Sequence, residues 1–494
     1  MELESVVGFL ENKTILITGA TGFLAKIFLE KVLRVQPNVK RIYLLLRAAE
    51  AESAYQRWQH EVIEKDLFSV LKEKWGANWR CFISEKTALV PGDISLDDEL
   101  GVKDHILVEE MFAELDVVIN LAATTNFDER YDVALGVNTM GAKHVLCFAK
   151  KCIKLPVLIH VSTAFVSGET SGLILETAYE MGEALNGTSG LNIDDEIKLA
   201  RERLNQLQAD GATTEQIRDS MKDLGIERAK VYGWPNTYVF TKAIGEMVVR
   251  QLKGNMSVAI VRPTIISSTY KEPFPGWIEG LRTIDSLAFF YGTGRLTFLP
   301  GDVESIVDVI PADMVVNAML VAMVAHAIQP LDRIYHVSSS QRNPNPLRYN
   351  NVQDCCYRYF SKNPWIGKNG KPVAVSKGKV LGSMASFRRY VTIRYLLPLK
   401  GLQLANVAFC CCYFDGMINH TNRKITLVMR LVELYRPFLF FSGVFDDTNT
   451  ENLRMASRER GTETDIFYFD PGSIDLREYL MNIHLPGLVK YAFK

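Results

Sequence analysis

Short apolar runs alternate with longer amphipathic or charged segments over the first 260 residues of the chain. Apolar, β-branched runs occur at 13–18, 41–46, 87–91, 115–121, 157–163 and 257–264, and the segment from 23 to about 35 has helical periodicity. Strands that alternate with helices are typical of a parallel sheet covered on both faces. We therefore predict an α/β fold built on a doubly wound parallel sheet.

The first apolar run ends in a glycine-rich turn, TGATGFLA at 18–25. Gly19 permits a tight turn, Gly22 lets the backbone approach a pyrophosphate, and Ala25 is small enough to keep the following helix close to the strand. The helix start offers free N–H groups to an anion. The turn predicts a Rossmann-type dinucleotide site, with contacts from Thr18, Gly19, Thr21, Gly22, Phe23 and Leu24.

The end of the second strand indicates which dinucleotide binds. An acidic residue there would accept a bond from a ribose 2′-OH, whereas this chain has Arg47, which favours a 2′-phosphate and therefore NADPH. Arg47 could instead be a solvated residue after a strand. Asp93 and Ile94 follow the third strand, and Asp93 could contact the adenine edge or simply open a solvated loop.

Tyr238 and Lys242 are four residues apart in YVFTK, a spacing that brings both side chains to one face of a helix. A tyrosine can donate a proton to a carbonyl oxygen if its phenolate is tolerated afterwards, and a nearby lysine lowers its pKa. The fifth strand ends in Ser162 and Thr163, where ligands sit in open parallel sheets. Thr163 could share the substrate oxygen with Tyr238, or could bond to the backbone at the strand end.

The strings TGATGFLA, NLAATTNFDERYDVALGVNTMGA at 120–142, HVSTAFV at 160–166 and YVFTK at 238–242 resemble the extended short-chain dehydrogenases/reductases. The longer strings GWPNTYVFTK, EPFPGWIEGLRTIDS and VIPADMVVNAM resemble the plant alcohol-forming fatty acyl-CoA reductases of the wax and suberin type. This resemblance covers nearly the whole chain.

The resemblance implies a two-step, NADPH-dependent reduction of long-chain or very-long-chain fatty acyl-CoA to a primary alcohol and CoA. It implies that Tyr238 and Lys242 are the catalytic pair and that Thr163 is the active-site hydroxyl. Asn138 matches the asparagine that supports the active-site helix, and we include Asn138 and Ala122, with Lys242, among the cofactor-binding residues.

The chain divides by composition into an NADP-binding reductase domain, 1–343, and a smaller, mainly helical C-terminal domain, 344–494. The first domain holds a charged helical insert at about 170–230, which is either a solvated flap or a cover for the acyl channel. We assign an acyl-site segment to about 264–330, in which the stretch 271–294 is rich in aromatic residues, Gly and Pro. Candidates to line an acyl site, or to pack beneath a loop, are Trp277, Leu281, Leu287, Phe289 and Phe290. We expect Arg262 to approach the nicotinamide end.

Composition and charge exclude several classes of protein. With 56 basic and 57 acidic residues, the net charge of −1 gives no field for a nucleic acid. The eight cysteines, including Cys355-Cys356 and Cys410-Cys411-Cys412, lack the spacing of a disulfide framework or a zinc site, so we expect a reducing compartment and no metal.

The N-terminal sequence resembles neither a secretory signal nor a transit peptide, and no run of about 18 to 20 apolar residues predicts a membrane span. We expect a location on the cytosolic face of the endoplasmic reticulum or in the cytoplasm. The basic, amphipathic segment 388–403 could rest on a membrane surface or form a core helix with a solvated face. The oligomeric state stays open.

Two other enzymatic functions remain: an acyl-CoA reductase that stops at the aldehyde, and a related reductase acting on a polar small molecule. The second would need a polar pocket, whereas residues 273–291 are rich in apolar side chains. A cofactor-sensing regulator has no need for Tyr238, Lys242 and Thr163 together, so their joint presence favours an enzyme.

Overall fold

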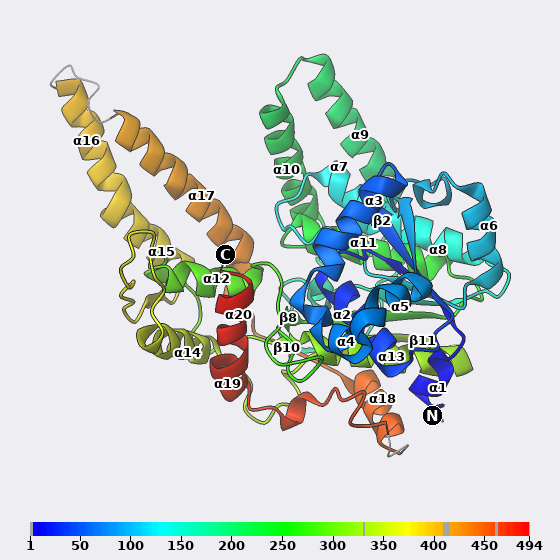
Figure 1. Ribbon diagram of the computed structural model, residues 1–494. Coiled ribbons are helices and arrows are strands. Elements are labelled where there is room, and N and C mark those ends of the chain that lie inside the picture. The colour runs from blue at the N-terminus through cyan, green and yellow to red at the C-terminus, as the bar shows by residue number, and fades with distance from the viewer. Residues whose placement is uncertain (1–2, 330, 409–414, 460–462, 494) are drawn as a thin grey trace.

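A seven-stranded, fully parallel sheet forms the centre of the molecule, with strand order β3-β2-β1-β4-β5-β7-β11 (Figure 1). The computed structural model describes residues 3–329, 331–408, 415–459 and 463–493. The α/β fold predicted from the apolar runs is confirmed. The strands are β1 (Thr14–Thr18), β2 (Arg41–Arg47), β3 (Thr87–Gly92), β4 (Val117–Asn120), β5 (Val157–Val161), β7 (Val258–Pro263) and β11 (Asp332–Val337).

Helices cover both faces of this sheet because successive residues of a strand point to opposite sides. Ile15 and Ile17 enter one core together with α2 (Phe23–Val35) and α13 (Ala312–Ile328). Leu16 enters the opposite core together with α6 (His105–Glu114) and α8 (Gly141–Lys151), and α11 (Thr237–Leu252) packs on that same side. Smaller helices of this part are α1 (Val6–Leu10), α3 (Ala51–Trp58), α4 (Ser69–Trp75), α5 (Trp79–Lys86), α7 (Tyr131–Ala134) and α12 (Thr283–Gly292).

The charged insert forms two long helices, α9 (Ile193–Ala209) and α10 (Thr214–Val231), which pack against each other. Asn192 and Thr213 cap their N-termini with side-chain oxygens, as the sequence pattern of such caps requires. α10 rests on α7 and α11 through the buried Met221 and Ala229. The insert therefore stands beside α11, the helix that carries Tyr238.

The C-terminal part is mainly helical, as predicted, and it has two regions. A projecting arm contains α15 (Met384–Val391), α16 (Leu397–Ala408) and α17 (Asp415–Leu439), and α17 faces the insert in Figure 1. The chain then returns to the body: β13 (Gly443–Phe445) pairs with β6 (Gly172–Ile174), and α18 (Thr448–Arg458) packs on α13 and β11. The remaining larger helices are α14 (Tyr349–Lys362) and α20 (Leu485–Tyr491).

The run Cys410-Cys411-Cys412, singled out in the sequence, lies outside the described residues. In the described ranges, no helix combines the length and apolar character needed to cross a bilayer.

Candidate active site

A crevice lies at the carboxyl ends of β1 and β4, where the strand order reverses and where open α/β sheets bind dinucleotides. Gly19 turns here with a φ of +65°, and a Cβ added to it would lie 2.8 Å from both N and Cα of Ala122. Gly22 precedes α2 and adds no side-chain cap, so the first N–H groups of that helix are open to an anion. The cavity over this turn measures about 200 Å³. These residues fit the pyrophosphate of a dinucleotide.

Thr18 shapes the floor of this crevice by joining its two strands. Its hydroxyl donates to Oδ1 of Asn120 at 2.7 Å and accepts from the N–H groups of Leu121 at 3.2 Å and Ala122 at 3.1 Å. Leu24, also predicted to bind the cofactor, packs in the core between α2 and the sheet. Thr18 and Leu24 thus hold the backbone of the turn, whereas Gly19, Thr21, Gly22 and Ala122 line the cavity itself.

Two arginines stand at the far end of the same cavity. Arg47, at the end of β2, lines it together with Arg57 of α3, which the sequence analysis did not identify. Arg57 donates through Nη1 to the carbonyl oxygen of Arg47 at 2.8 Å and through Nη2 to Oγ1 of Thr21 at 3.2 Å. Its guanidinium also pairs with Glu61. This end of the crevice therefore carries two adjacent positive charges.

Asp93 and Ile94 form the wall of the cavity next to β3. One carboxylate oxygen of Asp93, Oδ1, accepts from the N–H and the hydroxyl of Ser95, at 2.9 and 2.8 Å. Ile94 is buried, and its side chain packs where a Cβ on Gly141 would otherwise be. Asp93 is thus held by a local turn at the cavity edge, which leaves Oδ2 as its acceptor for a ligand.

Tyr238 and Thr163 meet at the wall of a second cavity, of about 380 Å³. Asn236 caps the N-terminus of α11, so Tyr238 lies in the first turn of the helix, and Thr163 lies two residues after the end of β5. Burial raises the pKa of the Tyr238 phenol to about 12, while the Thr163 hydroxyl and the charge of Arg282 act to lower it. The pKa of the phenol is thus raised rather than lowered, and the groups that act to lower it are Thr163 and Arg282 instead of the expected Lys242.

Lys242 is almost fully buried one turn after Tyr238. Its Nζ donates to the carbonyl oxygen of Val161 at 2.8 Å, at the carboxyl end of β5. Burial lowers the pKa of this ammonium to about 8, and the carboxylate of Glu246 works in the opposite direction. The lysine is thus anchored beneath the strand end that carries Thr163.

Asn138 supports the active-site helix from the side. Its Oδ1 accepts from the N–H of Thr124 at 3.0 Å, and its Nδ2 donates to Oγ1 of Thr241 at 3.0 Å. A Cβ on Gly245 would collide with the carbonyl oxygen of Asn138, so the two segments approach closely. Asn138 acts as a clamp between α11 and the loop after β4.

A cluster of aromatic side chains forms one part of the cavity beside Tyr238. The ring of Phe127 stacks on Tyr238 with centroids 5.8 Å apart, and it contacts Tyr435 and Phe438 of α17 at 5.4 and 5.0 Å. Phe165 meets Phe438 edge-on at 5.0 Å. The C-terminal arm therefore completes the cavity, although no local pattern in the sequence assigns α17 to this site.

The residues predicted to line an acyl site have different surroundings. Leu281 lines the cavity beside Tyr238. Leu287 lines a separate apolar cavity of about 70 Å³. Trp277 is buried and stacks on Phe23 at 5.2 Å, and Phe289 and Phe290 pack against each other at 5.4 Å. Of the five, the structure brings only Leu281 to the Tyr238 cavity.

Arg262 does not have the position expected for it. It is buried and bonds to Glu246 through Nε at 3.0 Å and Nη2 at 2.6 Å, and Nη1 donates to the carbonyl oxygen of Thr177 at 2.9 Å. A buried guanidinium needs such partners because its charge is otherwise uncompensated. The expectation that Arg262 approaches the nicotinamide end is therefore wrong.

Two charged residues at the cavity were not identified from the sequence. Arg282 acts on the Tyr238 phenol, as described above, and both Arg282 and Asp285 line the cavity. The buried Asp285 lies 3.0 Å, through Oδ1, from Nε2 of His484 near the C-terminus. Both residues lie in the string EPFPGWIEGLRTIDS, and this family resemblance was the sequence signal from which they could have been identified.

Solved structures support the fold. A reductase domain of a nonribosomal peptide synthetase from Mycobacterium tuberculosis aligns with a TM-score of 0.57 and 18% identity, over 97% of this chain and 93% of that one. The terminal R domain of the myxalamid pathway aligns with a TM-score of 0.55 and 18% identity, over 97% and 91%. At this identity the likeness extends to the fold alone.

Sequence relatives are much closer. Residues 17–319 and 394–494 match two domain families, both described as male sterility protein. The chain is 55% identical to the alcohol-forming fatty acyl-CoA reductase of Simmondsia chinensis and 53% identical to fatty acyl-CoA reductase 1 of Arabidopsis thaliana, in each case over 99% of both chains. It is 28% identical to fatty acyl-CoA reductase 2 of Homo sapiens, over 100% of this chain and 87% of that one. Together with the NAD(P)-binding crevice and the adjoining Tyr238 cavity, these matches establish that the chain belongs to the fatty acyl-CoA reductase family of oxidoreductases.

Proposed function

We propose that this protein reduces long-chain or very-long-chain fatty acyl-CoA to a primary fatty alcohol and CoA, for lipids of the wax or suberin type. The observation that carries the proposal is the junction of Tyr238 and Thr163 with an aromatic cavity that continues into the C-terminal arm. Relatives 55% and 53% identical over 99% of both chains, named fatty acyl-CoA reductases, support the substrate class. The aromatic side chains of Phe127, Phe165 and Phe438 in this cavity offer apolar surface to a long acyl chain.

The residues assist the reaction through proton transfer and charge. When bound in the crevice lined by Gly19, Thr21 and Gly22, NADPH would supply the hydride for both reductions, of the thioester and then of the aldehyde. In each step the Tyr238 phenol donates its proton to the developing alkoxide, and the Thr163 hydroxyl orients the same oxygen. The charged form of Lys242 stabilises the phenolate that remains. Release of the CoA thiol after the first step leaves the aldehyde as the second substrate.

The choice of NADPH over NADH is supported by the pair Arg47 and Arg57. A 2′-phosphate carries two charges that a planar guanidinium can bind through paired N–H groups. Arg57 reaches the crevice from α3, and its contact with the Arg47 carbonyl keeps the two side chains at one end of it. β2 ends in Arg47, at the position where an acidic residue would accept a 2′-OH.

Peripheral membrane association is the second part of the proposal, at the cytosolic face of the endoplasmic reticulum. The arm exposes large apolar side chains, with Leu397 at 54%, Leu404 at 69% and Leu427 at 57%. Residues 383–439 hold eight Lys and Arg against two Asp and Glu, an excess of six positive charges in a chain whose net charge is −1. Exposed apolar groups among basic ones favour an anionic lipid surface.

The reaction is tested by counting NADPH consumed and identifying the lipid formed from a panel of long-chain acyl-CoAs. We expect two NADPH per CoA released and an alcohol.

Tyr238→Phe should bind NADPH normally but lose about 10²- to 10⁴-fold in kcat, because it removes a general acid. Tyr335→Phe removes a buried phenol hydroxyl on β11, far from the site, and serves as the control. An aldehyde formed at one NADPH would correct the product, and an active Tyr238→Phe would remove the phenol from the acid role.

A pH profile tests the role of Lys242. Burial lowers its pKa to about 8, so the ammonium is charged below that pH and neutral above it. If the charged form is needed, kcat/KM for NADPH, which reports groups of the free enzyme, should be constant near pH 7 and fall about tenfold per unit as pH rises beyond 8. Lys242→Arg keeps its charge over this range, so its residual activity should lack that fall. A wild-type profile that stays flat to pH 10 would contradict the role.

Cofactor preference tests the two arginines. Arg57→Gln and Arg47→Gln should each raise KM for NADPH about tenfold or more and change KM for NADH little, because only NADPH carries the 2′-phosphate. Arg80, exposed on α5, supplies the control variant Arg80→Gln. Equal losses with both cofactors would place the two arginines outside 2′-phosphate recognition.

Flotation with liposomes tests membrane association. The wild-type protein should float with vesicles that contain about 30% anionic lipid and less with neutral ones. The double variant Leu397→Glu/Leu404→Glu should bind about tenfold more weakly, because two apolar contacts are replaced by charges that anionic lipid repels. Ile106→Glu changes an 83% exposed residue on α6 and should float like the wild type. Wild-type protein that stays at the bottom of the gradient would contradict the proposal.

A further inference from the structure

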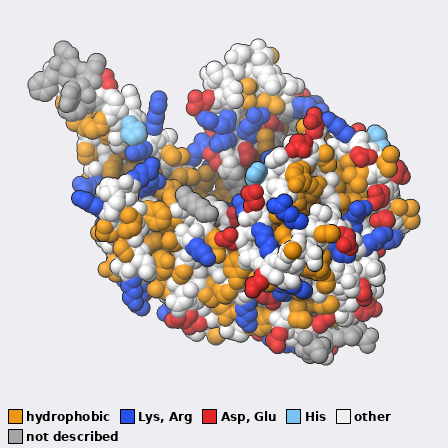
Figure 2. All heavy atoms as spheres, in the orientation of Figure 1, with side chains coloured by type: hydrophobic (Ala, Val, Ile, Leu, Met, Phe, Trp, Pro, Cys, Tyr) orange, Lys and Arg blue, Asp and Glu red, His pale blue; other side chains and the backbone are white. Residues whose placement is uncertain are grey.

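A cleft of about 810 Å³ separates the insert helix α10 from the arm helix α17. Figure 1 shows the two helices facing each other across it, and Figure 2 shows Lys and Arg side chains around the hollow between the arm and the insert. Its lining comes from four parts of the chain: α10 and the turn after it, α17, the start of α15, and Glu169 after β5.

This cleft adjoins the catalytic cavity. The side chain of Leu434 lines both spaces. Next to it, Arg430 of the cleft pairs with Asp128 of the cavity, through Nε at 2.9 Å and Nη2 at 2.7 Å. Leu434 and the Arg430–Asp128 pair therefore lie at the boundary of the two spaces, where a substrate that spans both would cross.

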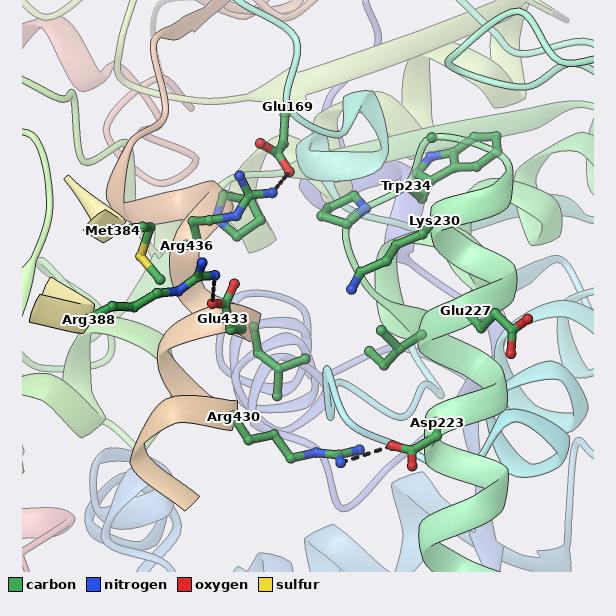
Figure 3. A pocket seen from close by; sticks show the side chains of 15 residues that line it. Glu169, Asp223, Glu227, Lys230, Trp234, Met384, Arg388, Arg430, Glu433 and Arg436 are labelled. Atoms are coloured by element: carbon green, nitrogen blue, oxygen red, sulfur yellow. Dashed lines mark hydrogen bonds and ion pairs between the residues drawn. The ribbon is translucent and has the colours of Figure 1, made fainter. Parts of the chain in front are cut away.

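The cleft is lined by four basic and four acidic side chains, and Lys230 is the basic one among them for which no ion pair is formed in the described residues. Figure 3 shows the amine of Lys230 extended into the space between α10 and α17, whereas the carboxylate of Glu227 points away from it. Arg436 binds Glu169 through Nη2 at 2.7 Å, and Arg388 binds Glu433 through Nη2 at 2.6 Å. Each of these guanidinium groups keeps further N–H donors, since an arginine has five.

The arginines of the cleft can exchange their carboxylate partners for a phosphate group. The side chains of Arg436 and Arg388 are 44% and 60% exposed, and exposed pairs of this kind are weak. A phosphate group carries more charge than a carboxylate and binds arginine through two parallel N–H donors. Between the charged groups lie apolar side chains, Ile226, Leu434 and Pro437, which suit an uncharged arm or a purine. The chemistry of the cleft matches a nucleotide with a long uncharged arm.

We propose that the cleft binds the phosphate-bearing nucleotide of the acyl-CoA thioester, an assignment that rests on the proposed function. The thioester lies at Tyr238, the pantetheine arm crosses beside Leu434, and the phosphates contact Lys230, Arg388 and Arg436. The acyl chain then occupies the aromatic cavity formed with α17. This arrangement gives the C-terminal arm a direct part in substrate recognition.

The test measures equilibrium binding of free CoA by titration calorimetry. Lys230→Gln and Arg436→Gln should each raise the Kd for CoA about tenfold, because a charged phosphate contact is lost. Glu433→Gln releases Arg388 from its carboxylate and should lower the Kd. Arg218→Gln removes an arginine that pairs with Glu215 and Asp219 on α10 outside the cleft, and should bind CoA like the wild type.

An assay with a second substrate distinguishes a failure of this inference from a failure of the proposed function. The ratio of kcat/KM for acyl-CoA to that for the matching acyl-N-acetylcysteamine, a thioester without a nucleotide, should fall about tenfold in Arg436→Gln. Unchanged CoA affinity in both Lys230→Gln and Arg436→Gln, or an equal loss on both thioesters, would overturn the cleft as the CoA site. A wild-type protein that binds CoA in the predicted, charge-dependent way but reduces no thioester would retain the cleft and reject the reaction.

Discussion

The hydrogen bond from Lys242 to the carbonyl oxygen of Val161 fixes the active-site helix against the end of β5, and the chemistry of the protein depends on it. Because the ammonium is buried, its pKa is lowered from 10.5 to about 8, a difference of about 3 kcal/mol between its protonation states. A buried ammonium of this kind is retained where the position of its side chain matters for the site. It sets α11 so that Tyr238, one turn earlier, lies beside Thr163, two residues after the end of the strand.

The same constraint explains why the clamp around α11 is polar on one side and closely packed on the other. Asn138 bonds to both Thr124 and Thr241, and Gly245 allows the backbone at Asn138 to come close. The loop after β4 is thereby held over the helix start, and Phe127 of that loop stacks on Tyr238. Helix position and cavity shape are thus set by one set of contacts.

The sequence predicted the sheet and the polar centre of the site because both are local signals. Apolar β-branched runs located six of the seven core strands, all but β11. The predicted Tyr238 and Thr163 line one cavity, whereas Lys242 bonds to the strand end at Val161. Contacts between distant segments were not predictable. Arg57, Arg282 and the aromatic residues of α17 carry no pattern that identifies their partners, and Arg262 was misplaced because its partner Glu246 is defined only by the packing of α11 on β7.

The Tyr238 phenol must hold its proton at neutral pH and must also be able to release it to the substrate, and burial alone favours only the first. Burial raises its pKa to about 12, which keeps the proton available at neutral pH, but the same burial would make the phenolate hard to form. The hydrogen bond of Thr163 and the charge of Arg282 both act to lower the pKa of the phenol. Arg282 precedes α12, in the segment that the aromatic composition had linked to the acyl chain, so this region also provides a positive charge that acts on the proton donor.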